Sequence, residues 1–275
     1  MEYQLLCVDL DGTLLNDKKQ LPAENAAALY QAWEAGMEIC IASGRGAESA
    51  GEYLKEMKIT GSVAALNGGM VVCHGKEIYR AGMNPEVVEQ VVDIVEEMKV
   101  IGFFNDGEGT LAVNEDEAAA RRRLQGNPAW LKTYHPETAK TLMEKVKNGH
   151  TIVKISIRED DPNRLEMIRE RILDTVKAQV AKSDVNYLDI FSYGQSKWTG
   201  IEKLLKHLGI SAESCVCFGD NENDREMIER AGLGITMANA EMDLKTRADF
   251  VTASNKENGV AYGIRTWVLG KPDGF

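Results

Sequence analysis

The sequence contains no long apolar run. Its apolar stretches all fall short of the about 18 residues that a membrane-spanning helix requires. The first four residues, Met1-Glu2-Tyr3-Gln4, also lack the basic segment that opens a signal peptide. We therefore expect neither a membrane span nor a cleaved leader, and we predict a cytoplasmic protein without a membrane partner.

Basic residues are outnumbered by acidic ones. The chain has 32 lysines and arginines against 43 aspartates and glutamates, which gives a formal net charge of -11. Because binding to phosphate polyanions needs clustered basic side chains, this balance predicts no nucleic-acid partner. A basic run, Arg121-Arg122-Arg123, follows the acidic run Glu115-Asp116-Glu117 closely, so we expect it on a solvated helix face.

Cysteine is scarce, and its spacing is uninformative for metal binding. The chain has five cysteines, and no two of them stand in the Cys-x-x-Cys spacing of zinc and redox sites. Cys7, Cys40, Cys215 and Cys217 lie inside apolar runs, and Cys73 follows one. We therefore expect reduced, buried thiols that act as small apolar side chains. The four histidines are scattered, without the i, i+4 pair of a zinc-binding helix.

What the sequence does contain is the alternation of an α/β protein. Hydrophobic residues make up 44% of the chain, which is enough for a large core. Short apolar runs at 5–8, 37–42 and 62–66 are typical of strands buried on both faces. Helical patterns over 22–35 and 47–58 separate these runs. The expected fold class is therefore α/β, with a doubly wound parallel sheet and helices on both faces.

The pattern changes from about residue 83. An amphipathic helix over 86–99 is followed by short strands and by a second strand-and-helix set, which together are typical of an α+β module. The alternation of strand and helix returns after Gly194, with a helix over 198–208 and a strand over 215–218. We therefore expect a core of residues 1–82 and 190–275 and an inserted module of residues 83–189.

Two carboxylates follow the first predicted strand directly. Asp9 and Asp11 stand two residues apart, so on an extended chain their side chains project to the same side. Two like charges at that separation repel each other unless a cation or a shared proton relieves the repulsion. Mg²⁺ prefers hard oxygen ligands and would relieve it.

Three more polar clusters stand where predicted strands end or helices begin. Ser43-Gly44-Arg45 offers a hydroxyl and backbone N–H groups ahead of a helix, which is a natural cradle for phosphate. Lys197 opens the helix over 198–208. Asp220 and Asp224 stand about one helical turn apart and could face one metal ion. In open α/β sheets, ligands bind at the carboxyl edge where such clusters lie.

Each cluster taken alone also has an ordinary structural explanation. Asp-Gly pairs are common in turns, and Ser43 could cap the helix that follows it. Lys197 could be a solvated charge, Asp224 could be an acidic residue at a helix N-terminus, and Asn67 could serve only its turn. The occurrence of all these clusters in one chain favours a functional site over these separate explanations.

The clusters together resemble the haloacid dehalogenase superfamily, and within it the Cof-type phosphatases with a type IIB cap. The motifs that carry the resemblance are Asp9-Leu10-Asp11-Gly12-Thr13-Leu14, Ser43-Gly44-Arg45, Lys197 and Gly219-Asp220-Asn221-Glu222-Asn223-Asp224, with supporting stretches at 67–69, 237–240 and 255–260. They occur in the family's order, whereas the insert matches only in position and pattern. Two positions depart from the family pattern, Gly69 and Trp198, and we expect Trp198 to narrow the entrance to the phosphate pocket.

The resemblance implies a role for each matching residue. Asp9 is implied as the nucleophile that forms an aspartyl-phosphate, and Asp11 as the general acid and base. Mg²⁺ is implied on the Asp9 carboxylate, the Asp11 backbone carbonyl and Asp220, with Asp224 as a ligand or as support for one. The phosphoryl oxygens are implied to bind Leu10, Ser43, Gly44, Lys197 and Asn223.

The implied activity is Mg²⁺-dependent hydrolysis of a small phosphorylated metabolite, such as a sugar phosphate, a nucleotide or a phosphorylated cofactor. The insert is implied to be a mobile cap that closes over the core and selects the substrate. Two other activities stay open: a phosphomutase that uses the same aspartyl-phosphate, and a phosphorelay receiver that keeps the phosphoryl group for a partner. The sequence leaves the individual substrate, the cap residues that select it and the oligomeric state undetermined.

Overall fold

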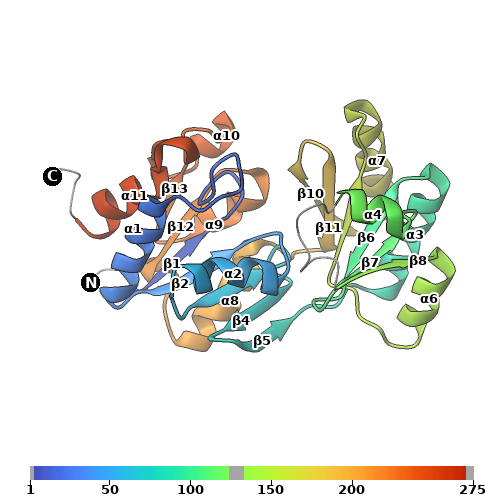
Figure 1. Ribbon diagram of the computed structural model, residues 1–275, viewed down its shortest axis with the longest axis horizontal. Helices are drawn as coiled ribbons and strands as arrows, with labels where there is room; N and C mark the ends of the chain where they lie inside the picture. The colour runs from blue at the N-terminus through green and yellow to red at the C-terminus, as the bar shows by residue number, and fades with distance from the viewer. Residues whose placement is uncertain (1–2, 124–132, 271–275) are drawn as a thin grey trace. The chain divides into compact units, whose positions relative to one another are not determined.

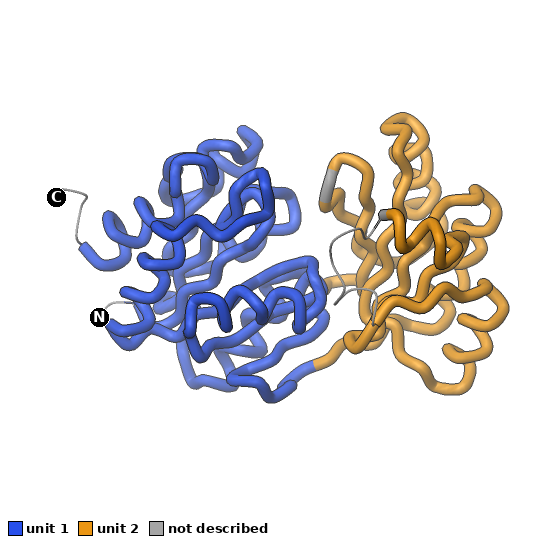
Figure 2. Tube along the Cα trace, viewed as in Figure 1, with its two compact units in different colours: residues 1–79, 196–275 blue, residues 80–195 orange. Residues whose placement is uncertain are grey.

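The computed structural model describes residues 3–123 and 133–270 of the chain. These residues form two compact units, which Figure 2 colours separately. Unit 1 comprises residues 1–79 and 196–275, and unit 2 comprises residues 80–195. Unit 1 is an α/β domain and unit 2 is an α+β domain, so the fold class expected from the sequence is confirmed.

Unit 1 is built on one large sheet. Its strands are β1 (Leu5–Val8), β2 (Glu38–Ala42), β3 (Ser62–Ala65), β4 (Met70–Cys73), β5 (Lys76–Arg80), β12 (Cys215–Gly219), β13 (Leu233–Thr236) and β14 (Phe250–Val251). Their order across the sheet is β14-β13-β12-β1-β2-β3-β4-β5. Figure 1 labels all of these strands except β14 and β3. The strands from β14 to β3 run parallel, and β4 is antiparallel to β3. All four residues of β1 are buried, which explains its unbroken apolar run.

Helices cover both faces of this sheet. They are α1 (Ala23–Glu34), α2 (Ala47–Glu56), α8 (Lys197–Leu208), α9 (Arg225–Arg230), α10 (Met242–Lys245) and α11 (Gly259–Gly263), with short 3₁₀ turns at 212–214, 222–224 and 255–257 and a π turn at 264–268. On one face α1 packs against α11, where Gly263 meets the ring of Phe218 on β12. On the other face α8 and α9 contribute Trp198, Ile201 and Met227 to a core that also contains the strand cysteines.

Unit 2 contains a second sheet. Its strands are β6 (Ile101–Asn105), β7 (Thr110–Val113), β8 (Tyr134–Glu137), β9 (Lys154–Arg158), β10 (Ala178–Asp184) and β11 (Tyr187–Ser192), in the order β10-β11-β9-β6-β7-β8. Its helices are α3 (Pro85–Met98), α4 (Glu117–Arg123), α6 (Ala139–Lys147) and α7 (Pro162–Thr175). The helices α3, α6 and α7 share one large apolar core with the sheet, and Ala120 of α4 packs with Phe103 and Tyr134 in a smaller one.

The parallel strands of unit 1 determine where a ligand can bind. Because β13, β12, β1, β2 and β3 are parallel neighbours, the segments that follow them all emerge at the same edge of the sheet. The chain continues from β1 to β2 on one side, whereas β12 lies on the other, so the strand order reverses at β1. This reversal is the point at which open α/β sheets bind ligands. Within the described residues, no helix is both long and apolar enough to cross a membrane.

Candidate active site

Asp9 and Leu10 begin the loop that follows β1. The Asp9 N–H donates to the carbonyl of Phe218 at 3.0 Å, so the pairing of β1 with β12 continues one residue past the strand. The Asp9 carbonyl then accepts the N–H of Leu14 at 3.1 Å, and the Leu10 carbonyl accepts that of Leu15 at 2.9 Å. These bonds close a tight loop that keeps the side chain of Asp9 at the sheet edge, where it is 5% exposed.

Lys197 is the cation at the centre of the site. Its Nζ donates to Asp9 Oδ1 at 2.5 Å and to Asp224 Oδ1 at 2.6 Å, and the Lys197 residue is only 1% exposed. Burial acts to lower the pKa of Lys197, but the charges of Asp224 and Asp9 raise this pKa well above its ordinary value. The lysine therefore stays charged in a buried position, and its explanation as a solvated surface charge is wrong.

Asp220 lies against the loop that follows β1. The hydroxyl of Thr13 donates to Asp220 Oδ1 at 2.6 Å, and Asn239 Nδ2 donates to the carbonyl of Gly12 at 2.8 Å. Gly12 has φ +89°, and a Cβ atom at this position would lie 2.3 Å from Asp220 Oδ2. Only glycine meets both conditions, the backbone conformation and the close approach of the carboxylate.

The donor set of this site fits a divalent cation. Carboxylate oxygens of Asp9, Asp220 and Asp224 lie within 4.8 Å of one another, and Lys197 supplies one positive charge against three acidic groups. Burial raises the pKa of Asp9, and despite the opposing charge of Lys197 this pKa stays well above its usual range. Burial and the charge of Asp224 raise the pKa of Asp220 to about 7. Hard oxygen donors with excess negative charge are the ligands that Mg²⁺ prefers.

Asp224 has a different set of contacts from Asp9 and Asp220. Its Oδ2 accepts the backbone N–H groups of Asp220 and Asn221, both at 3.0 Å, while its Oδ1 accepts Lys197. The side chain is fully buried and makes no capping bond to α9. Its explanation as an acidic charge at a helix N-terminus is therefore incomplete. The carboxylate does cap the 3₁₀ turn 222–224 through the N–H of Asn221, but it also accepts Lys197 and the N–H of Asp220.

Ser43 and Gly44 follow β2 at the same edge. Ser43 is 2% exposed, and its Oγ accepts the N–H of Arg45 at 3.2 Å. The helix α2 begins only at Ala47, and the residue before it, Gly46, makes no side-chain capping bond. The explanation of Ser43 as the cap of this helix is therefore wrong. The Ser43 hydroxyl instead orders the short turn that contains Gly44.

Asp11 faces two cations that the sequence-based site did not include. Arg45 donates from Nε to Asp11 Oδ2 at 2.8 Å and from Nη2 to Asp11 Oδ1 at 2.6 Å, and Lys19 Nζ lies 2.8 Å from Oδ1. Burial acts to raise the pKa of Asp11, but the hydrogen bonds and charges of Arg45 and Lys19 lower it. Arg45 was signalled by its motif, Ser43-Gly44-Arg45, whereas no sequence pattern pointed to Lys19.

Asn223 also meets a residue from another loop. Its Nδ2 donates to Oδ1 of Asn67 at 3.0 Å, and Asn67 is fully buried. The turn explanation of Asn67 is therefore incomplete, because its side chain reaches a predicted phosphate-binding residue. All nine predicted site residues lie in unit 1, in the segments that follow β1, β2 and β12 and in the first turn of α8.

Comparison with known proteins identifies the family to which this arrangement belongs. The family model described as haloacid dehalogenase-like hydrolase matches residues 6–264, a span that includes every segment of the site. The chain belongs to this hydrolase family. The predicted resemblance is thereby confirmed.

Curated relatives of this hydrolase include several phosphatases. A 5-amino-6-(5-phospho-D-ribitylamino)uracil phosphatase of Bacillus subtilis (strain 168) is 29% identical over 269 residues, which cover 98% of this chain and 97% of the relative. A pyridoxal phosphate phosphatase of Escherichia coli (strain K12) is 27% identical over 279 residues, which cover 98% and 100% of the two chains. The predicted enzyme class, a phosphoric monoester hydrolase, is confirmed.

Solved structures share the fold along nearly the whole hydrolase chain. A sugar phosphatase of haloacid dehalogenase subclass IIB matches with a TM-score of 0.83 and 22% identity, covering 96% of this chain and 98% of that one. A structure from Thermotoga maritima matches with a TM-score of 0.77 and 27% identity, covering 96% and 97% of the two chains. The first match shows that the fold is that of subclass IIB.

Trp198 of the hydrolase does not lie where the sequence placed it. The residue is 2% exposed and belongs to the core cluster of α8, where the guanidinium carbon of Arg230 lies 5.5 Å from its ring centroid. Successive helical residues point about 100° apart, so Trp198 turns into the core while Lys197 faces the carboxylates. The expectation that Trp198 narrows the phosphate pocket is wrong.

The cysteines of the hydrolase lie in the same core. All five are buried, and Cys215 Sγ lies 3.9 Å from Cys7 Sγ and 3.7 Å from Cys217 Sγ. Burial raises the pKa of the Cys7 and Cys217 thiols, which keeps them neutral. The prediction that the cysteines are buried among apolar residues is confirmed.

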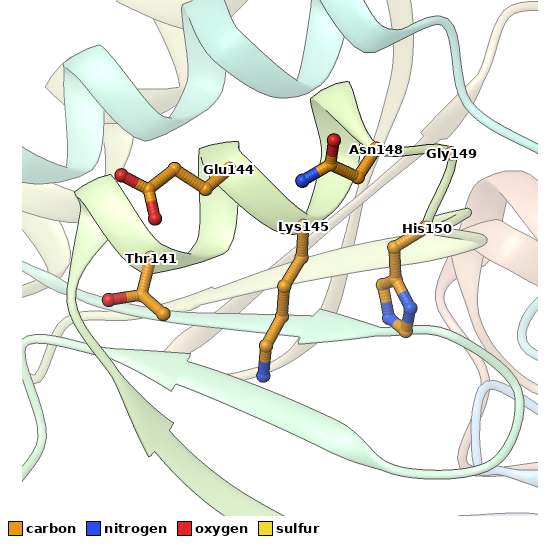
Figure 3. Close-up of a pocket in the computed structure, with 6 residues that line it drawn as sticks. All are labelled: Thr141, Glu144, Lys145, Asn148, Gly149 and His150. Carbon is orange, nitrogen blue, oxygen red and sulfur yellow. The ribbon is translucent and has the colours of Figure 1, made fainter.

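Unit 2 of the hydrolase carries a separate hollow beside α6 (Figure 3). Its volume is about 580 Å³, and it is lined by Thr141, Glu144, Lys145, Asn148, Gly149 and His150. The two basic side chains that line it already face carboxylates: Lys145 pairs with Glu137, and His150 lies 3.0 Å from Asp106. The hollow therefore lacks the uncompensated positive charge that a phosphate needs.

Proposed function

We propose that this hydrolase removes the phosphoryl group from a small phosphorylated metabolite through an aspartyl-phosphate on Asp9, with Mg²⁺ as its cofactor. The observation that carries the proposal is the buried cluster in which Lys197 joins Asp9 and Asp224 beside Asp220. Placing two buried carboxylates and a third, partly buried one around a single lysine is costly unless a cation completes the charge balance. A purely structural role gives no reason for that cost.

Asp9 is the proposed nucleophile. One of its oxygens accepts Lys197, and this contact holds the carboxylate in a fixed orientation at the sheet edge. Attack of an Asp9 oxygen on phosphorus forms the new oxygen–phosphorus bond and breaks the bond to the leaving oxygen. Lys197, the hydroxyl of Ser43, the backbone around Leu10 and Gly44 and the amide of Asn223 would hold the phosphoryl oxygens.

The metal would be held by Asp9, the backbone carbonyl of Asp11 and Asp220. Bound there, Mg²⁺ would stabilise the negative charge of the transferring phosphoryl group. The two backbone N–H bonds and the Lys197 bond of Asp224 favour a supporting role for this carboxylate, which orients the turn that carries Asp220. Asp224 is therefore proposed as support for a metal ligand.

Asp11 is the proposed acid and base. In the first step a protonated Asp11 gives its proton to the leaving oxygen, and Asp11 becomes a carboxylate. In the second step that carboxylate takes a proton from the attacking water, phosphate leaves and Asp9 is regenerated. The contacts with Arg45 and Lys19 stabilise the carboxylate form, which is the form that the second step requires.

The proposed substrates are sugar phosphates, nucleotides and phosphorylated cofactors. Two relatives are named for phosphoribitylamino-uracil and pyridoxal phosphate, which are both small phosphomonoesters. A sugar phosphatase shares the fold. Unit 2, whose fold differs from that of the catalytic unit, is proposed to act as the cap that selects among such compounds.

The test is phosphate release from a panel of phosphorylated metabolites, with Mg²⁺ and with EDTA, for the wild type and Asp9→Asn. We expect Mg²⁺-dependent turnover that Asp9→Asn abolishes, because the amide is a poor nucleophile. Asp174→Asn is the matched control, since Asp174 is exposed on α7 of unit 2. Absence of wild-type turnover on every ester, with folded protein and bound Mg²⁺, would overturn the proposal. Turnover that requires a bisphosphate activator and releases no phosphate would instead identify a mutase.

A further inference from the structure

The loop after β3 has an unusual backbone. Leu66 and Asn67 have φ +53° each, and Gly68 has φ +81°, so three successive residues lie in the left-handed region. Asparagine tolerates this region better than other residues with side chains, but leucine does not. Such strain persists only where the surrounding structure fixes it, and it is concentrated at functional sites. The contacts of this loop with neighbouring segments must therefore hold its left-handed backbone in place.

The backbone of the loop is joined to the segment that carries Ser43. The Asn67 N–H donates to the carbonyl of Ser43 at 3.1 Å, and the Leu66 N–H donates to that of Arg45 at 3.0 Å. These two bonds join the turn of Ser43 and Gly44 to the loop that follows β3. A shift of the loop would therefore move a proposed phosphate-binding segment.

The loop also packs against the start of α8. A Cβ atom on Gly68 would lie 2.0 Å from the carbonyl oxygen of Ser196, and one on Gly200 would lie 2.6 Å from the Cα of Gly68. The two backbones are thus in contact where the helix presents Lys197. Residues 66–68 therefore touch the second of the three segments that carry proposed phosphate ligands.

The side chain of Asn67 reaches the third segment. It is fully buried, and its Oδ1 accepts one N–H of the Asn223 amide at 3.0 Å. Because an amide NH₂ group carries two N–H bonds, this contact fixes the direction of the second one. The interaction joins residues 156 positions apart in sequence.

We propose that Asn67 is a positioning residue that orients the Asn223 amide and the Ser43 turn toward the phosphoryl group, an inference that rests on the proposed function. Asn67 acts through Asn223, whose second N–H donates to a phosphoryl oxygen. The left-handed backbone is what allows one residue to bond Ser43 through its main chain and Asn223 through its side chain.

The test is a double-mutant cycle of Asn67→Gly and Asn223→Ala. Glycine adopts φ +53° readily, so the first variant removes the amide and keeps the loop conformation. We expect Asn67→Gly to raise KM and the Ki of inorganic phosphate by about tenfold, the effect of losing one hydrogen bond to a charged group. The double variant should be no worse than Asn223→Ala alone, because Asn67 acts through Asn223. The Mg²⁺ concentration for half-maximal activity should not change.

Asn114→Gly is the matched control. Asn114 also has a left-handed φ, +64°, and its side chain bonds only backbone carbonyls of unit 2 among the contacts that the structure gives. This variant should lower the melting temperature and leave KM and Ki unchanged. All assays are run at a temperature at which circular dichroism shows each variant fully folded.

Three outcomes would overturn the inference. KM and Ki could be unchanged in Asn67→Gly, or the increases in KM and Ki of the two single variants could multiply in the double variant. The Mg²⁺ concentration for half-maximal activity could also rise in Asn67→Gly by as much as KM does. The failure of the proposed function would look different, because the wild type itself would then release no phosphate. An active wild type with an unaffected Asn67→Gly variant rejects the role of Asn67 alone.

Discussion

Lys197 carries the charge balance of the active site. Its ammonium group pairs with the carboxylates of both Asp9 and Asp224, and all three side chains are buried. Replacing one partner of a buried ionic cluster leaves the others uncompensated, which costs about 3–5 kcal/mol. The same replacement removes a proposed phosphate contact, so stability and activity should fall together.

Lys197→Met is predicted to lower kcat/KM by about 10²–10³-fold, the usual cost of losing one donor to a developing negative charge. The free energy of unfolding should also fall by several kcal/mol, which urea unfolding at pH 7 would measure. Lys206→Met is the control, because Lys206 is exposed in the last turn of the same helix. A Lys197→Met variant as stable as the control would contradict the buried charge cluster.

A substitution at Gly12 tests whether its close approach to Asp220 matters for Mg²⁺ binding, and Gly36 of the same chain serves as the control. Gly12 and Gly36 both have positive φ, +89° and +94°, but a Cβ on Gly12 would collide with Asp220 while one on Gly36 meets nothing within 4 Å. Alanine at either position should cost about 1–2 kcal/mol in backbone strain. Only Gly12→Ala should also raise the Mg²⁺ concentration for half-maximal activity, by about tenfold or more, because Asp220 must move. Equal Mg²⁺ dependence of the two variants in steady-state assays would refute this explanation.

At the level of secondary-structure elements, α8 shows how local sequence places a functional residue. The Ser196 side chain accepts the N–H of Thr199, and the Thr199 hydroxyl accepts the N–H of Ser196, so the pair caps the helix at its first residue, Lys197. The helix ends at Gly209, which has φ +69°. Because both ends are fixed locally, the sequence predicted this helix to within one residue.

Ser196→Ala is predicted to lower the free energy of unfolding by about 1–2 kcal/mol, because it removes both the N-cap bond to Thr199 and the bond that the Ser196 hydroxyl donates to Glu226 Oε2 at 2.6 Å. Since Lys197 follows the cap directly, kcat/KM should also fall. Ser211→Ala provides the comparison, because Ser211 precedes a short 3₁₀ turn without a side-chain capping bond. Chemical denaturation of both variants measures the difference, and equal unfolding free energies would show that the cap of α8 contributes nothing.

Two strands that the sequence analysis missed lack a local signal. β10 (Ala178–Asp184) reads AQVAKSD, in which Val180 is the sole branched apolar residue, so no apolar run marks it. β8 (Tyr134–Glu137) contains Pro136, which is tolerated because β8 is an edge strand of its sheet. Pairing with β11 and β7 makes these segments strands, and such pairing is decided by the tertiary structure.

At the level of the whole molecule, the metal site links pH to stability. Burial and the charge of Asp224 raise the pKa of Asp220 to about 7, whereas an unfolded aspartate has a pKa of about 3.9. Between these two values the metal-free folded chain binds a proton that the unfolded chain does not. The contribution of Asp220 to stability therefore falls as pH rises from about 4 to about 7. Burial raises the pKa of Asp9 as well, so its contribution has the same sign.

Mg²⁺ binds the ionised carboxylates, so it should offset the fall in stability that the metal-free chain shows as pH rises. We predict that the rise in melting temperature from EDTA to Mg²⁺ is small at about pH 5.5 and grows toward about pH 8. Asp220→Asn should remove most of the rise at both values, because the variant lacks the titrating group and a proposed ligand. Melting curves recorded by circular dichroism check both statements, and a rise independent of pH in the wild type would be inconsistent with them.

The sequence by itself determined the fold class, the order of the motifs and the placement of Asp9, Ser43 and Asp220 directly after buried strands. These features follow from local spacing, because an apolar run fixes a strand and parallel strands end at one edge. The tertiary structure alone decided which side chains meet across that edge. Arg45 bonds Asp11 from 34 residues away, and Asn67 bonds Asn223 from 156 residues away. Such pairs depend on how neighbouring loops pack, and the distance between two loops in space is not encoded in their separation along the chain.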